Sequence, residues 1–135
     1  MRPRRRYGIA VAVYVTGLAA LVLWPLTAKD SGAMWDLSAW LGYDYTPARE
    51  IAADVTINVL AFVPVGFLLQ RIVRGGGPAS RGGALVALAA GASVAVIFET
   101  VQWMFAWRIA SVTDVAANTA GTAVGLALER LLGRA

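Results

Sequence analysis

Residues Ile97 to Gly125 read IFETVQWMFAWRIASVTDVAANTAGTAVG. Apolar runs flank this stretch, yet it contains five strongly polar side chains: Glu99, Gln102, Arg108, Asp114 and Asn118. In a soluble protein such residues would mark a solvated helix face. Inside a bilayer they would be costly, and ionisable groups kept there usually have a function. The rest of the chain decides between these two interpretations.

The composition is that of a membrane protein. Of the 135 residues, 59% are hydrophobic and 15% are charged, whereas a soluble domain has about 25% charged residues. The mean hydropathy is +0.64. The chain contains neither cysteine nor histidine, which excludes disulfides, thiolate or imidazole metal sites and a Ser-His triad. Any acid–base chemistry would therefore depend on carboxylates, Tyr, Lys or Arg.

Four apolar segments are long enough to cross a hydrocarbon core of about 30 Å. They cover residues 7–26, 51–72, 83–106 and 112–132. A cleavable signal peptide is the alternative for the first segment, but the apolar region of a signal peptide is usually only about 7–15 residues long. We therefore predict an all-α, polytopic membrane protein in which residues 1–135 form one domain, a four-transmembrane-helix bundle.

The polar connection 27–49 follows the first segment. Its residues Met34, Leu37, Trp40 and Leu41 recur at helical spacing, and Trp and Tyr favour the membrane–water interface. This pattern predicts a short interfacial helix in the first outer loop.

Small residues recur at every fourth position of the third segment: Gly83, Ala87, Gly91 and Ala95. Such a ridge allows another helix to approach closely. The next position on the ridge is Glu99, so we expect its carboxylate to face another helix and not lipid. Gly121 and Gly125 form a second close-packing motif in the fourth segment. Ser111 and Asp114 have the S-x-x-D spacing of a helix start.

The charges are distributed unevenly across the predicted bundle. Nine of the twelve basic residues lie on the side that holds both termini and the glycine-rich loop near residue 76. The opposite side keeps only Lys29, Arg49 and Arg108, together with seven of the eight acids. The positive-inside rule predicts that the Arg-rich side, with both termini, is cytoplasmic. The basic excess is then a topology signal, and we expect membrane lipid and no nucleic acid as a partner.

The acids and amides of the opposite side predict one polar site in the outer half of the bilayer. Asp54 and Asn58 have the same i, i+4 spacing as Asp114 and Asn118. The predicted ligand-binding residues are Asp54, Asn58, Glu99, Gln102, Arg108, Asp114 and Asn118. Structural roles are the alternatives: Asp114 as a helix cap, the asparagines as interhelical hydrogen-bonding groups, and Arg108 as an interfacial anchor or counterion.

The polar motifs and their order resemble those of the VanZ-like family, small bacterial integral membrane proteins related to a teicoplanin-resistance accessory protein. The resemblance extends over about residues 50–130. It is carried by Asp54-x-x-x-Asn58 followed by Pro64 and Gly66, Glu99-x-x-Gln102, Arg108, and Asp114-x-x-x-Asn118-x-x-Gly121. It implies a protein of the bacterial plasma membrane that is linked to the cell envelope or to tolerance of glycopeptide antibiotics.

Three classes of function remain open from the sequence. The first is non-catalytic binding of a polar envelope ligand, either a lipid-linked cell-wall precursor or a glycopeptide. The second is an intramembrane enzyme on a lipid-linked precursor, with Glu99 as general acid or base, or with Asp54, Glu99 and Asp114 as ligands of a divalent cation. The third is a cation-coupled transporter or flippase, which would need a homo-oligomer because four spans are few. No other cofactor is indicated.

Overall fold

A computed structural model describes residues 3–23, 47–75, 77–78, 80–105 and 111–133 of the chain. The described residues form four helices: α1 Pro3–Leu23, α3 Pro47–Arg74, α4 Arg81–Phe105 and α5 Val112–Leu132. The predicted all-helical fold is confirmed. The predicted interfacial helix falls on residues outside the described part of the chain.

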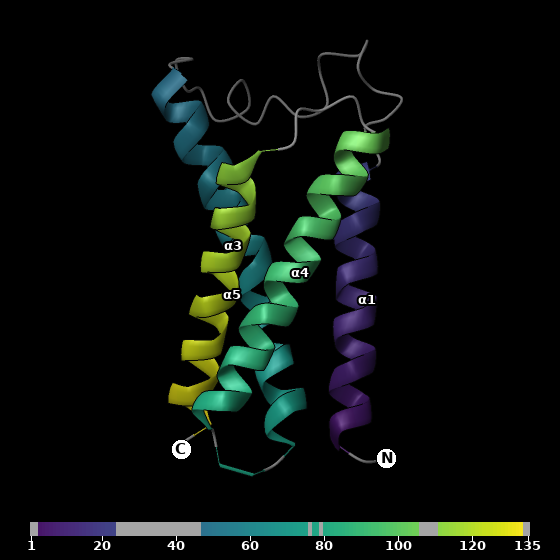
Figure 1. Ribbon diagram of the computed structural model, residues 1–135, viewed down its shortest axis with the longest axis vertical. Coiled ribbons are helices and arrows are strands. Elements are labelled where there is room, and N and C mark those ends of the chain that lie inside the picture. The colour runs from purple at the N-terminus through teal and green to yellow at the C-terminus, as the bar shows by residue number, and fades with distance from the viewer. Residues whose placement is uncertain (1–2, 24–46, 76, 79, 106–110, 134–135) are drawn as a thin grey trace.

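Both termini lie at the same end of the helix bundle (Figure 1). α1 and α4 run away from this end, whereas α3 and α5 run back towards it. Among the described residues, two helices are long and apolar enough by composition to cross a membrane, over Ile51–Arg74 and Arg81–Met104. α3 and α5 are therefore parallel to each other, and the antiparallel α4 separates them in the chain.

The parallel helices α3 and α5 pack with their backbones almost in contact. A Cβ atom at Gly121 would overlap the carbonyl oxygen of Val59, and one at Gly125 would overlap that of Val63. On the other side of the same interface, a Cβ at Gly66 would overlap the backbone of Thr122. Only glycine allows this approach, so the G-x-x-x-G motif of α5 faces α3.

The small-residue ridge of α4 faces the interior of the bundle, as the sequence predicts. Ala87 and Ala95 are fully buried, and Gly91 packs against the side chain of Thr122 on α5. The ridge fixes which side of α4 the bundle covers. The next position along it, Glu99, is consequently directed inward as well.

α1 joins the other helices through a hydrogen bond next to the proline of α3. The Tyr14 hydroxyl donates to the carbonyl oxygen of Ala61 at 2.9 Å. Pro64 lies inside α3 and has no N–H to bind the carbonyl of Leu60, which weakens the helical ladder at this level. Beside this bond Phe62 packs edge-on against Phe98 of α4, with ring centroids 6.0 Å apart.

Candidate functional site: the start of α5 and the helices around it

The first turn of α5 is organised by Ser111. This residue is the N-cap, with extended backbone angles, and its hydroxyl oxygen accepts a hydrogen bond from the backbone N–H of Asp114 at 3.3 Å. Asp114 is thus the third residue of the helix, where a carboxylate is favoured by the helix dipole. The predicted helix start is confirmed, and it places Asp114 half-buried at the end of the bundle away from the termini.

Glu99 of α4 reaches this same turn. Its Oε2 accepts a hydrogen bond from the backbone N–H of Ser111 at 3.0 Å, and the residue is only 7% exposed. In a capping box, a carboxylate from the third helical residue binds the N–H of the N-cap. Here a carboxylate from a different helix occupies that role, so Glu99 joins α4 to the start of α5.

Two amide side chains lie buried near this contact. Gln102 follows Glu99 by three residues and is 9% exposed. Asn118 lies one turn below Asp114 and is 4% exposed, and its Oδ1 has no hydrogen-bond partner within the described residues. A buried amide oxygen without a partner is costly, so Asn118 offers an acceptor for a donor group.

The α3 residues of the predicted site lie at the same level of the bundle. Val59 and Val63 face Gly121 and Gly125, and extending this parallel register places Asp54 between the levels of Asp114 and Asn118. Asp54 is exposed and Asn58 is half-buried.

Asn58 shares a helix face with two core residues of α3. It precedes the buried Phe62 by four positions and the buried Val65 by seven, so it is directed towards the interior of the bundle. The structure therefore brings Glu99 together with the start of α5, and the register of α3 and α5 places the α3 pair at the same level.

Arg108 lies outside the described residues. In the part of the chain that the structure describes, no group of three or more acidic side chains is arranged to hold a metal ion. Glu99 and Asp114 each make a further interaction in addition to those given above.

A second polar cluster occupies the opposite end of the bundle. Glu129 of α5 is completely buried, and its Oε1 lies 3.0 Å from Nε of Arg71 and 3.2 Å from a terminal nitrogen of Arg74. Gln70, one turn above Arg74, is also buried, and its Oε1 has no partner within the described residues. From the sequence alone these arginines are only topology signals, because a contact between α3 and α5 is not visible in local spacing.

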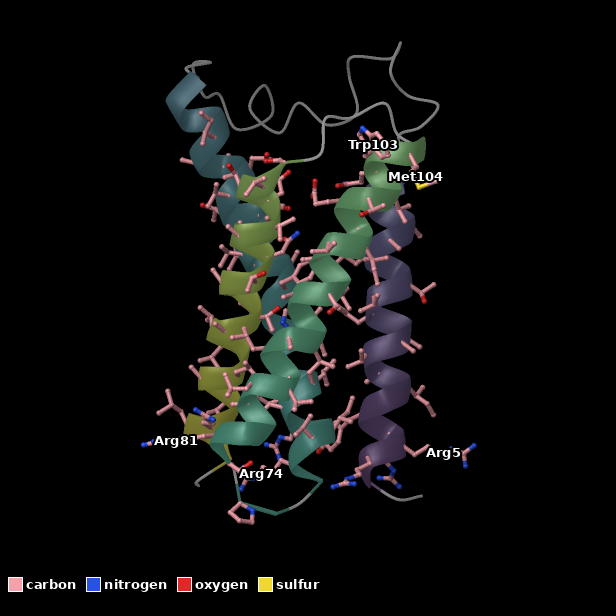
Figure 2. The ribbon with its side chains drawn as sticks, viewed as in Figure 1. Arg5, Arg74, Arg81, Trp103 and Met104 are labelled. Atoms are coloured by element: carbon pink, nitrogen blue, oxygen red, sulfur yellow. The ribbon has the colours of Figure 1, made fainter. Side chains whose placement is uncertain are left out.

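The two ends of the bundle differ in chemistry (Figure 2). Trp103 and Met104 are exposed at the end near Glu99, whereas Arg5, Arg74 and Arg81 lie at the end of the termini.

A profile of the VanZ/LLP1 family matches residues 11–133. The chain belongs to the VanZ/LLP1 family.

The VanZ/LLP1 match extends over the complete candidate site and over most of each described helix. Family membership, together with the two apolar helices α3 and α4, identifies a membrane protein. No curated protein and no solved structure matches the chain.

Proposed function

We propose that this VanZ/LLP1 protein is a four-span protein of the bacterial plasma membrane that binds a polar ligand of the cell envelope at its outward-facing end. The ligand class is a lipid-linked cell-wall intermediate. The proposed binding residues are Asp54, Asn58, Glu99, Gln102, Arg108, Asp114 and Asn118. Through this binding, the protein contributes to tolerance of glycopeptide antibiotics.

The observation that carries the proposal is the burial of three polar side chains in the halves of α4 and α5 where Glu99 binds Ser111. Glu99, Gln102 and Asn118 are all at least nine-tenths buried. Apolar side chains at these positions would be enough to pack the helices together. The bond to Ser111 gives Glu99 a structural role. Asn118 has no such explanation, because its buried Oδ1 has no hydrogen-bond partner in the described part of the protein. A ligand with N–H or O–H groups, such as a sugar or a peptide, supplies the missing donor.

The exposed surfaces support four membrane spans. α5 contains Asn118, Thr122 and Glu129, which lower its average hydropathy, yet all three are buried against other helices. Ten positions of α5 are exposed, and only one of them, Thr113, is polar. The part of α1 between Ile9 and Ala20 likewise exposes no charged side chain. Both helices thus present to their surroundings the apolar surface that lipid requires.

Cysteine labelling tests the orientation and the crossing of the membrane by α4, because the chain has no cysteine of its own. Pro78 and Thr113 are exposed at opposite ends of the bundle. In intact cells, a membrane-impermeant maleimide should label Thr113→Cys and leave Pro78→Cys unlabelled until the cells are permeabilised. Labelling of Pro78→Cys alone would reverse the proposed orientation, and labelling of both in intact cells would contradict the four-span topology.

Ligand binding is tested with charge- and amide-removing variants and neighbouring controls. Glu99→Gln, Asp114→Asn and Asn118→Leu should each reduce both glycopeptide tolerance in a bacterial host and retention of a labelled lipid-linked cell-wall precursor by the purified protein. The matched controls, Thr100→Ala and Thr113→Ala, alter exposed residues directly beside two of these positions and should behave as the unmodified protein.

Protein level and membrane insertion are measured for every variant, so that loss of fold is separated from loss of binding. Wild-type tolerance and precursor retention in all three site variants would contradict the proposal. Conversion of the retained precursor into a new product would identify an enzyme, and ion-gradient-dependent uptake into proteoliposomes would identify a transporter.

A further inference from the structure

The end of the bundle that carries both termini is strongly basic. Within the described residues this end has a single acid, Glu129, and seven arginines: Arg4, Arg5, Arg6, Arg71, Arg74, Arg81 and Arg130. All four helices contribute to the set, and Figure 2 shows Arg5, Arg74 and Arg81 spread across this end. The net positive charge of this surface is far from balanced by Glu129.

Some of these arginines stabilise the bundle by connecting its helices. Arg71 and Arg74 both bind Glu129, and Arg74 also donates to the carbonyl oxygens of Gly77 and Gly133. Arg130 donates to the carbonyl oxygen of Ser80 at 3.2 Å. These bonds connect the end of α3, the loop before α4 and the end of α5, so the guanidinium groups involved have structural partners.

Arg5, Arg6 and Arg81 have no such partners in the part of the chain that the structure describes. They are exposed and make no hydrogen bond or ion pair within the described residues. They stand in the first turns of α1 and α4, where the helix dipole disfavours cations, and neither first turn contains an acid. These three arginines therefore do not stabilise their own helices, and no acid among the described residues balances their charge.

We propose that Arg5, Arg6 and Arg81 bind the phosphate headgroups of anionic phospholipids. The exposed helix surfaces next to them are apolar, with Ile9 and Leu85 about one turn along, so the guanidinium groups lie where acyl chains give way to headgroups. Every basic residue at this end is arginine, whose planar fork binds phosphate through two parallel hydrogen bonds. This surface is separate from the proposed envelope-ligand site, which lies at the other end of the bundle.

The proposal is tested with the purified full-length protein in nanodiscs that contain equal amounts of phosphatidylglycerol and phosphatidylcholine. Both faces of a nanodisc are open to solvent, so the result does not depend on the orientation of the protein. Native mass spectrometry of the released protein should show retained phosphatidylglycerol in preference to phosphatidylcholine. The Arg5→Gln/Arg6→Gln/Arg81→Gln variant should lose this preference by roughly fivefold for each arginine removed, the equivalent of about 1 kcal/mol per basic residue. The Arg→Lys triple variant keeps the charge and should keep most of the preference.

Thermal unfolding of each variant in detergent verifies that the bundle is intact. Equal retention of the two lipids by the wild-type protein would overturn the proposal, as would an unchanged preference in a folded glutamine variant. If soluble glycerol phosphate displaces the retained lipid at equal concentration, the surface is a site for free phosphate and the lipid assignment is wrong. Failure of the envelope-ligand assays leaves this measurement unaffected, because they probe the other end.

Discussion

Glu99 of α4 accepts a hydrogen bond from the backbone N–H of Ser111, the N-cap of α5, at an N···Oε2 distance of 3.0 Å. The bond connects two helices through a group that every helix start leaves without an intrahelical partner. It also places a negative charge at the positive end of the α5 dipole. One side chain therefore both fixes the start of α5 and contributes a carboxylate to the proposed site.

The two roles of Glu99 can be separated by substitution. Glu99→Gln retains an oxygen that can accept the hydrogen bond from Ser111, so it should lower the free energy of unfolding by less than about 1 kcal/mol. Glu99→Ala leaves the buried N–H donor without its partner and should lower the free energy of unfolding by about 1–3 kcal/mol. Thermal unfolding in detergent measures both, with Thr100→Ala as the control. A glutamine variant with wild-type stability that no longer retains the ligand would assign binding to the charge. Equal destabilisation by both substitutions would show that the hydrogen bond is not what stabilises the α4–α5 contact.

The glycines between α3 and α5 should be intolerant of even one methyl group. Gly121→Ala and Gly125→Ala place a Cβ on a backbone carbonyl of α3, so each should destabilise the bundle by about 1–3 kcal/mol or more. Gly17→Ala is the control, because nothing lies within 4 Å of a Cβ at that position. Denaturation of the three purified variants compares them directly. Wild-type stability in Gly121→Ala would contradict the close approach of the two helices.

Glu129 should be the most sensitive position at the Arg-rich end. It is fully buried between α3 and α5 and binds two arginines whose side chains are 32% and 20% exposed. Removing one member of a buried ion pair costs about 3–5 kcal/mol, and the partial exposure of the arginines places Glu129→Gln near the lower end. A double-mutant cycle with Arg74→Gln should show coupling well above the ~0.5 kcal/mol of independent sites. Additive effects would mean that the pair does not contribute to stability.

The bond from Tyr14 to Ala61 should hold α1 against the bundle. Tyr14→Phe removes only the hydroxyl group that donates at 2.9 Å, and the expected loss is about 0.5–1.5 kcal/mol. Tyr7→Phe is a suitable control, since Tyr7 lies on the same helix and makes no hydrogen bond within the described residues. Protease sensitivity of the α1 segment in detergent should rise in the first variant and not in the second.

Local patterns in the sequence predict much of this fold. The lengths of the apolar segments predict the four helices. The four-residue spacing of small residues from Gly83 to Ala95 predicts the buried face of α4. Ser111 and Asp114 predict the start of α5. These signals are local because each depends on neighbours within one or two turns of a helix.

The contacts that depend on register between helices are not predictable in this way. Glu129 binds Arg71 and Arg74 because α3 and α5 are parallel with one particular offset, and no pattern within either helix encodes that offset. The same applies to the bond between Glu99 and Ser111, in which a backbone group is the donor. The ligand-binding role of the seven proposed residues stays a prediction, and Arg108 and the first outer loop fall outside the described part of the chain.

The parallel arrangement of α3 and α5 also has a consequence for how the protein is made. α3 is synthesised before α5, and this partner does not exist until α4 and the connection after it have been added. During that interval Arg71 and Arg74, the two arginines that bind Glu129, have no α5 to contact. A chain that stops before Ser111 is therefore a folding intermediate with unpaired polar groups, and we expect the cell's membrane quality-control proteases to remove it. α5, the last helix to be made, thus supplies the buried acid that pairs with the arginines of α3.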